Sequence, residues 1–243
     1  MHEDKIFTLI YQFKRFGILS HWMPNAIGLW PNEQECLLWL ALNSNPQADW
    51  MEIGSFCGGS AVLMCLARRM IADNRPAVYS VDCDFDKYGM FDRNVYQMGG
   101  FARISIKIEC DSNKLEEYYN GSRDPLSFVF IDGFHSFKQV VNDFNKVLPW
   151  LTGDAIVAFH DVSPRLIDSI SEEHDYDELF QNDHEDFRLD EAVSYILENN
   201  QDFSLVNIPV KKDILHFKET NLKTWVRGKT SPFNALAAIR RNQ

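Results

Sequence analysis

The chain has few of the features that mark disulfide-rich, zinc-binding or membrane proteins. Its five cysteines show no CxxC pair and no zinc-type spacing, which argues against a disulfide framework. No apolar run approaches the roughly 20 residues that a membrane helix needs. The first residues also lack the basic start and apolar block of a signal peptide. These absences predict a cytoplasmic protein that does not bind a membrane.

Positive charge is scarce as well. The 243 residues carry a net charge of −11, and this balance argues against a broad nucleic-acid surface. Residues 171–191 contain ten acids and one base, whereas residues 220–243 contain five bases and no acid. We interpret the acidic block as a solvated insertion, with a lid or a cation-binding rim as the alternative.

The length and a hydrophobic content of 45% suit one α/β domain with a sizeable core. We divide this domain into an N-terminal helical cap (1–45), a core (46–219) and a basic tail (220–243). The acidic insertion is placed at 163–190 within the core. Trp225, Phe233 and Leu236 are candidates to anchor the tail, which has few other structural signals.

Apolar runs that are long enough for strands alternate with segments of helical periodicity. This alternation predicts a doubly wound, mainly parallel α/β sheet that helices cover on both faces. Two last runs, joined by Lys211-Lys212-Asp213, predict a C-terminal antiparallel hairpin. The expected strands are 49–53, 77–81, 103–109, 126–131, 155–160, 203–210 and 214–218, and the expected helices are 3–16, 32–42, 136–151 and 190–199.

The first expected strand runs into a glycine-rich turn, Glu52-Ile53-Gly54-Ser55-Phe56-Cys57-Gly58-Gly59-Ser60. Glycines let the backbone approach a ligand closely, and the free N–H groups of a helix start favour a carboxylate or a phosphate. The turn therefore predicts a small-ligand site. An ordinary strand-to-helix turn without a ligand is the alternative.

Polar side chains also follow the other expected parallel strands. In parallel sheets, ligands bind beyond the carboxyl ends of the strands. Taken together, these side chains predict one site at that edge, although Asp82 and Asp111 also suit helix caps or turns. The side chains are Asp82, Asp111, Asp132 and the pair His160-Asp161.

On these residues the chain resembles the class I methyltransferases that use S-adenosylmethionine, over about 33–218. The turn looks like their first motif, acid-x-Gly-x-x-x-Gly-x-Ser, and the fold implied is Rossmann-like. The resemblance implies that the turn holds the methionine end of the cofactor, that Asp82 accepts hydrogen bonds from the ribose, and that Asp111 and Ser112 meet the adenine. The cofactor-binding residues expected are Glu52, Gly54, Ser55, Phe56, Gly58, Ser60, Asp82, Asp111, Ser112 and Asp132.

A second signature narrows the resemblance. Asp132-Gly133-Phe134-His135-Ser136-Phe137 and His160-Asp161 are similar to motifs of macrolide-sugar and other small-molecule O-methyltransferases, with Phe137 where tyrosine is common. Several of those enzymes use Mg²⁺. The resemblance implies a metal held by Asp132, Asp161 and His160, with a buried hydrogen-bonding role as the alternative for His160. It also implies His135 as general base.

A bound divalent cation lowers the pKa of a hydroxyl and orients it for attack. The carboxylates of these residues suit Mg²⁺, which prefers oxygen ligands. Relatives often have two adjacent oxygen ligands after the fifth strand, whereas this chain has His160 and Asp161. The acceptor is expected to be a small molecule or sugar. The oligomeric state of the protein is left open, a homo-oligomer included. Aromatic walls suit such an acceptor, and the candidates are Trp22, Met23, Trp30 and Phe134, any of which could equally be core.

Two other functions compete with a methyltransferase. A nicotinamide-dependent oxidoreductase has a similar sheet but needs Gly-x-Gly-x-x-Gly after the first strand, and Phe56 occupies the position of the second glycine. A non-catalytic cofactor-binding protein has no need for Asp132, His135 and Asp161 together. Both alternatives are therefore weaker.

Overall fold

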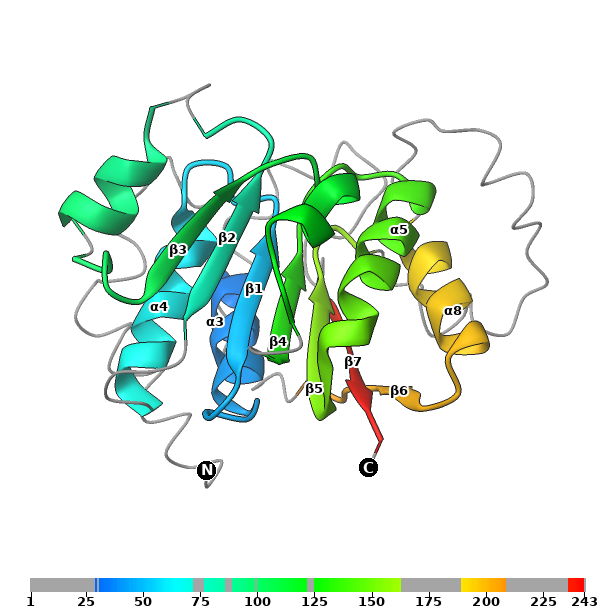
Figure 1. Ribbon diagram of the computed structural model, residues 1–243. Helices are drawn as coiled ribbons and strands as arrows, with labels where there is room; N and C mark the ends of the chain where they lie inside the picture. The colour runs from blue at the N-terminus through cyan, green and yellow to red at the C-terminus, as the bar shows by residue number, and fades with distance from the viewer. Residues whose placement is uncertain are drawn as a thin grey trace, which may run out of the picture.

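The structure is a computed structural model in which strands and helices alternate from residue 31 onward (Figure 1). The residues that it describes are 29, 31–71, 77–85, 89–98, 100–121, 125–162, 189–208 and 236–242. The expected helix 3–16, the residues Trp22, Met23 and Trp30, nearly all of the acidic insertion and the strand 214–218 lie outside these ranges.

Seven strands form one sheet in the order β3-β2-β1-β4-β5-β7-β6. The first five strands pair in parallel, whereas β7 is antiparallel to both β5 and β6. The strands are β1 (Asp49–Ile53), β2 (Val78–Asp82), β3 (Ser105–Glu109), β4 (Leu126–Ile131), β5 (Leu151–Phe159), β6 (Phe203–Leu205) and β7 (Ala237–Arg241). The predicted fold class, a doubly wound and mainly parallel sheet with a C-terminal antiparallel pair, is confirmed.

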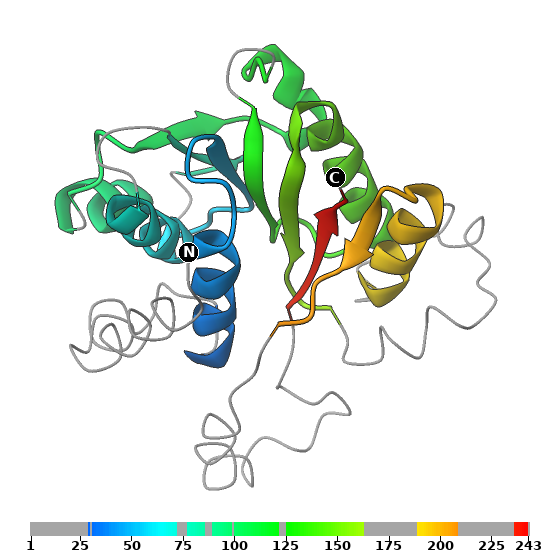
Figure 2. The same ribbon diagram turned by 90° about the horizontal axis from the view of Figure 1, so that it is seen from below.

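Helices cover both faces of the sheet (Figure 2). α3 and α4 lie on one face, and α5 and α8 lie on the other. Their bounds are α3 (Pro31–Leu42), α4 (Gly59–Ile71), α5 (Phe137–Val147) and α8 (Leu189–Asn199), and the short helical segments are η1 (Asp92–Met98), η2 (Ser112–Glu117) and η3 (Leu148–Trp150).

The core is split between the two faces because successive residues of a strand point to opposite sides. Trp50 of β1 packs with the α3 and α4 side chains, whereas its neighbour Met51 packs with those of α5 and α8. Both residues are fully buried. Strands buried on both faces are expected to be almost continuously apolar, which explains why β4 and residues 155–159 of β5 were recognisable in the sequence. β5 begins earlier than predicted, at Leu151, because its first part contains Thr152, Gly153 and Asp154.

A local signal fixes the start of α5. Ser136 has an extended backbone and accepts a hydrogen bond at its hydroxyl from the backbone N–H of Gln139. A serine at this position satisfies one of the helix's free N–H groups. The helix then buries Val140, Val141 and Phe144 against the sheet. Because α5 begins at Phe137, only a short loop joins Asp132 at the end of β4 to this helix.

The antiparallel partner of β6 differs from the one expected. The sequence predicts a strand at 203–210, but β6 ends at Leu205 and pairs with β7, from the segment interpreted as a basic tail. In β7, Ala237 and Ala238 are buried between β5 and β6. Alanine has a low strand propensity, so residue type gives little indication of this strand.

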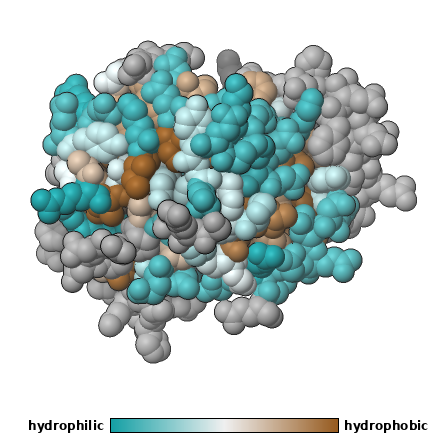
Figure 3. Space-filling model, in the orientation of Figure 1, coloured by the Kyte–Doolittle hydropathy of each residue, from teal (hydrophilic) through white to brown (hydrophobic). Residues whose placement is uncertain are grey.

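The face of the molecule seen in Figure 1 is mostly hydrophilic, with smaller hydrophobic patches between polar regions (Figure 3). Among the residues that the structure describes, no helix has the length and apolarity needed to cross a bilayer. The cytoplasmic location expected from the sequence stays a prediction.

Candidate active site

The polar residues expected at one edge of the sheet do lie there. The parallel register aligns the carboxyl ends of β1, β2, β3, β4 and β5. The segments that leave these ends carry the glycine turn, Asp82, Asp111, Asp132 and the pair His160-Asp161. The topology therefore brings together residues that are more than 100 positions apart in the sequence.

The glycine turn leaves β1 with an unusual backbone. Gly54 and Gly58 have positive φ values of 90° and 80°, a region that other residues rarely adopt. A Cβ atom added to Gly54 would collide with the carbonyl oxygen of Asp132. Glycine at position 54 is therefore required both by its backbone angle and by the close approach of the β4 end.

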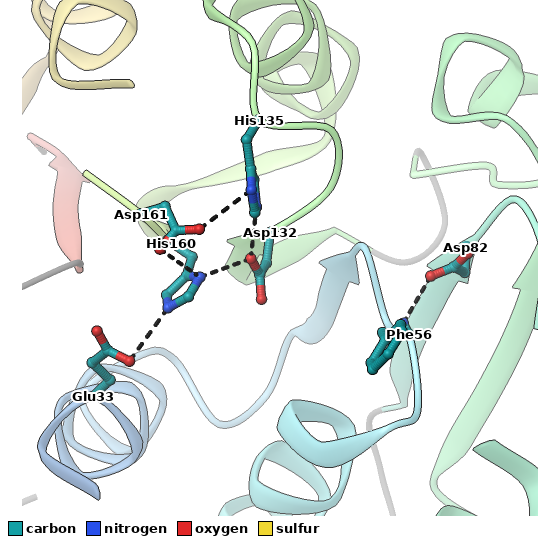
Figure 4. Close-up of polar contacts among 7 residues, drawn as sticks. All are labelled: Glu33, Phe56, Asp82, Asp132, His135, His160 and Asp161. Carbon is teal, nitrogen blue, oxygen red and sulfur yellow. Dashed lines mark hydrogen bonds and ion pairs between the residues drawn. The ribbon is translucent and has the colours of Figure 1, made fainter. Parts of the chain in front are cut away.

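Asp82 ties this turn to the end of β2. Its carboxylate accepts the backbone N–H of Phe56 at 2.7 Å (Figure 4). It also accepts the backbone N–H of Asp84, at 3.1 Å. Phe56 itself has a φ of 45°, and 48% of its surface is exposed. A bulky residue in this region costs energy, and the Asp82 contact helps to hold it there.

Glu52 lies beneath the turn and is fully buried. Its carboxylate accepts hydrogen bonds from the hydroxyls of Ser60 and Ser80, at 2.7 and 2.9 Å. Burial raises the pKa of Glu52 to about 7, and these hydrogen bonds oppose the rise. Ser55 is also buried and donates its hydroxyl to the carbonyl of Val81. The described contacts of Glu52, Ser55 and Ser60 therefore support the turn from behind.

Asp111 caps η2. Its carboxylate accepts from the backbone N–H of Asn113 at 2.9 Å and from the Asn113 amide at 3.0 Å. Ser112 accepts a hydrogen bond from the side chain of Gln139 on α5, at 3.1 Å. The Asp111 contacts show that this residue caps a helix, which was the alternative that the sequence left open. A role of Asp111 or Ser112 in binding adenine stays a prediction.

Asp132, His135, His160 and Asp161 form a compact cluster beyond β4 and β5 (Figure 4). One ligand atom from each lies within 4.8 Å of the others. Asp132 Oδ1 is 3.2 Å from His135 Nε2 and 2.9 Å from His160 Nδ1. Asp161 Oδ2 is 3.3 Å from His135 Nδ1. The structure thus brings together the expected base and all three expected metal ligands.

Mutual pairing controls the charges of this cluster. Burial opposes ionisation of Asp132, but hydrogen bonds from His135 and His160 lower its pKa. Burial likewise opposes protonation of His160, yet its contacts with Asp132 and Glu33 raise its pKa to about 10. The hydrogen bond with Asp132 raises the pKa of His135. Without a cation, the histidines neutralise the carboxylates.

Asp161 adopts a left-handed backbone with a φ of 55°. Aspartate tolerates this region better than most residues, and the conformation turns the chain as it leaves β5. The side chain then lies next to His135 and also 3.6 Å from His160 Nδ1. A rare backbone conformation at a polar cluster is typical of functional sites.

Glu33 is a member of the site that sequence reasoning missed. It lies in the first turn of α3, 1% of its surface is exposed, and its Oε2 is 3.4 Å from His160 Nε2. The sequence did not single it out, because its neighbours Gln34 and Glu35 are polar and buried as well. Periodicity could not show which strand end it would face.

Phe134 is half exposed beside His135, whereas Phe137 is buried in the core. The exposure of Phe134 is compatible with its expected place in an acceptor pocket. The other three candidates for that pocket lie outside the described residues.

Comparison with known proteins gives the class of the central segment. Residues 51–162 match the family model of a methyltransferase domain. This stretch begins in β1 and ends after Asp161, so it contains the glycine turn, Asp82 and the whole cluster. Residues 51–162 are therefore similar to a methyltransferase domain, and the resemblance of this segment to class I S-adenosylmethionine-dependent methyltransferases is confirmed. No curated protein gives a significant sequence match to the chain.

Solved structures of methyltransferases share the fold over the full chain. An O-methyltransferase from Bacillus cereus in complex with SAH aligns with a TM-score of 0.59 and 12% identity, covering 100% of this chain and 93% of that one. TomG, an O-methyltransferase from Streptomyces achromogenes involved in tomaymycin synthesis and solved with SAM, aligns with a TM-score of 0.59 and 13% identity. This alignment covers 100% of this chain and 92% of TomG. SAH-bound PaMTH1 from Podospora anserina aligns with a TM-score of 0.59 and 11% identity, covering 100% of this chain and 97% of that one. At these identities the likeness shows the fold.

Proposed function

We propose that the chain is an S-adenosylmethionine-dependent O-methyltransferase that acts on a hydroxyl of a small molecule or sugar, with help from a divalent cation. The observation that carries this proposal is the position of the Asp132 cluster directly beside the glycine turn. Gly54 packs against the Asp132 carbonyl, so a ligand on the turn and an acceptor at the cluster would be neighbours.

The cofactor would lie across the ends of β1, β2 and β3. S-adenosylmethionine supplies an electrophilic methyl group on a positively charged sulfur. The turn from Gly54 to Ser60 would face its methionine part, with Phe56 and Gly58 closest, and Asp82 would accept from the ribose. Asp111 and Ser112 would meet the adenine, and Asp132 would lie at the methyl end. Glu52, Ser55 and Ser60 would act through the turn that they support.

The cluster has suitable donors for a divalent cation. Asp132 and Asp161 offer carboxylate oxygens, and His160 offers an imidazole nitrogen, all within 4.8 Å of one another. When bound, a divalent cation lowers the pKa of a coordinated hydroxyl and orients it. Mg²⁺ is the cation that the resemblance implies. The two carboxylates suit it, whereas imidazole suits transition metals better.

His135 would take the proton of the acceptor hydroxyl. As the acceptor oxygen bonds to the methyl carbon and the carbon–sulfur bond breaks, the proton would pass to a ring nitrogen of His135. Both ring nitrogens now face carboxylates, Nε2 at Asp132 and Nδ1 at Asp161. One of these two contacts must therefore open before His135 can accept the proton.

A small acceptor fits the remaining observations. Phe134, which precedes His135 in the sequence, is half exposed, and exposed aromatic surface suits a sugar or a ring. The net charge of −11 disfavours a nucleic acid as the acceptor. TomG, with the same fold, is an O-methyltransferase involved in tomaymycin synthesis.

A methyl-transfer screen over sugars and phenols tests the proposal, with each acceptor assayed with Mg²⁺ and with a chelator. We expect transfer to a hydroxyl that the chelator abolishes. Transfer that survives chelation would remove the metal from the proposal and leave the methyltransferase. Calorimetry with S-adenosylhomocysteine and with NAD should show binding of the first only. Binding of NAD alone would favour an oxidoreductase.

A further inference from the structure

Two carboxylates hold His160 from opposite sides of its ring. Nδ1 lies 2.9 Å from Asp132 Oδ1 within the cluster, and Nε2 lies 3.4 Å from Glu33 Oε2 on α3 (Figure 4). The second distance is long for a hydrogen bond and within ion-pair range. His160 and Glu33 are 8% and 1% exposed, so bulk water does not separate them.

Glu33 reaches the cluster from outside the segment that carries the other four residues. It is 127 positions before His160, and it precedes the matched methyltransferase domain. α3 contacts β5 directly, which sets the distance between the two side chains. A buried carboxylate is costly unless it is paired, and His160 is one partner of Glu33, with 3.4 Å between His160 Nε2 and Glu33 Oε2.

The chemistry of imidazole ligands gives this arrangement a consequence. An imidazole that binds a metal through one nitrogen keeps its proton on the other. In metal sites that second N–H usually donates to a carboxylate or carbonyl, which fixes the tautomer and the ring orientation. Here Nδ1 faces the cluster, and Nε2 faces Glu33.

We infer that Glu33 is a positioning residue that holds the Nε2 proton of His160 and thereby presents Nδ1 to the cation as a nitrogen ligand. This inference rests on the metal in the proposed function. It also predicts selectivity, because imidazole suits transition metals such as Zn²⁺, whereas Mg²⁺ prefers oxygen ligands.

Metal titration of the full chain tests the inference. Binding of Mn²⁺ is followed by loss of the electron paramagnetic resonance signal of the free ion, and Mg²⁺ binding by competition. Glu33→Gln should weaken Mn²⁺ binding by about 10–100-fold and weaken Mg²⁺ binding less. The matched control is Glu35→Gln, which removes another buried carboxylate from α3. Residues two apart on a helix do not share a face, so this variant should bind Mn²⁺ like the wild type.

Equal affinities of wild type and Glu33→Gln for Mn²⁺ would overturn the role of Glu33. Failure of the wild type to bind any cation would overturn it together with the metal of the proposed function, whereas methyl transfer is tested separately in the screen. If Glu33→Gln does not fold, nitrogen-15 NMR of histidine-labelled wild type decides. With Zn²⁺ bound, the His160 signal, assigned by its loss in His160→Gln, should show a protonated Nε2 and a metal-shifted Nδ1. The opposite tautomer would overturn the inference.

Discussion

Phe56 donates its backbone N–H to the Asp82 carboxylate at 2.7 Å, which couples the glycine turn to the end of β2. The same carboxylate is the one expected to bind the ribose of the cofactor. We therefore expect Asp82 to have two connected tasks: its contact with Phe56 helps to hold the conformation of the turn, and it would also offer oxygens to the cofactor.

Replacement of Asp82 by alanine should weaken binding of S-adenosylhomocysteine by about tenfold or more. A hydrogen bond to a charged group contributes about 1.5–3 kcal/mol, and each 1.4 kcal/mol is a factor of ten. Isothermal titration calorimetry measures the change. The neighbouring exposed acid Asp84, replaced in the same way, is the control for local charge. Unchanged affinity in Asp82→Ala would show that the cofactor lies elsewhere.

Replacement of His135 by alanine should act on turnover instead. Loss of a general base lowers kcat by about 10²–10⁴-fold, and His135 lies on the far side of Asp132 from the glycine turn (Figure 4). Affinity for S-adenosylhomocysteine should therefore stay within about twofold of the wild type, which corresponds to a change of less than about 0.5 kcal/mol in binding free energy. Steady-state kinetics and calorimetry on the same preparation separate the two quantities. An equal loss of affinity in the Asp82 and His135 variants would contradict their separate roles.

A series of glycine substitutions should separate steric collision from backbone strain. Gly54→Ala should cost several kcal/mol of unfolding free energy or prevent folding, because its Cβ would meet Asp132. Gly100 has a positive φ of 67° but open space around it, so Gly100→Ala should cost only about 1 kcal/mol. Gly153 has neither constraint, and its substitution should be close to neutral. Urea denaturation gives the order, and a mild effect at Gly54 would mean that the two strand ends can separate.

Much of the sheet and the site was predictable because the signals are local. β1 and β4 have the predicted bounds, since β1 stops at the glycine turn and β4 is a short, mostly apolar run that stops at Asp132. The cluster followed from one topological rule, that parallel strands end at a common edge. Asp132 and Asp161 could therefore be expected to meet although 29 positions separate them.

The rest depends on packing between distant segments. β7 was missed because its alanines and arginines are poor strand formers, and the sheet recruits them only through pairing with β5 and β6. Its two arginines counted as part of a basic tail, yet Arg240 donates to the carbonyl of Asn43 and Arg241 to the carboxylate of Asp202. Glu33 was missed for the same reason, because its partner is set by how α3 crosses β5.

Glu52 should make the protein less stable as the pH rises. Its pKa is raised from 4.5 to about 7 in the folded protein, so the folded state holds a proton that the unfolded state releases. The resulting stability is complete below pH 4.5 and is lost as the pH rises to about 7. The whole loss is about 3 kcal/mol at roughly 1.4 kcal/mol per pH unit.

Because Glu52→Gln removes this titration, its stability relative to wild type should increase from pH 5 to pH 8, as measured by urea unfolding at each pH. Ser60 and Ser80 can still hydrogen-bond to an amide at position 52, so the fold should be retained. Glu116→Gln is the control, since Glu116 is exposed and its contact with Lys146 lowers its pKa. Its effect on stability should be small and nearly constant from pH 5 to pH 8, because a lowered pKa places its titration below that range. If Glu52→Gln and wild type lost stability in parallel between pH 5 and pH 8, Glu52 would be ionised throughout, and its two serine contacts would be those of a buried anion.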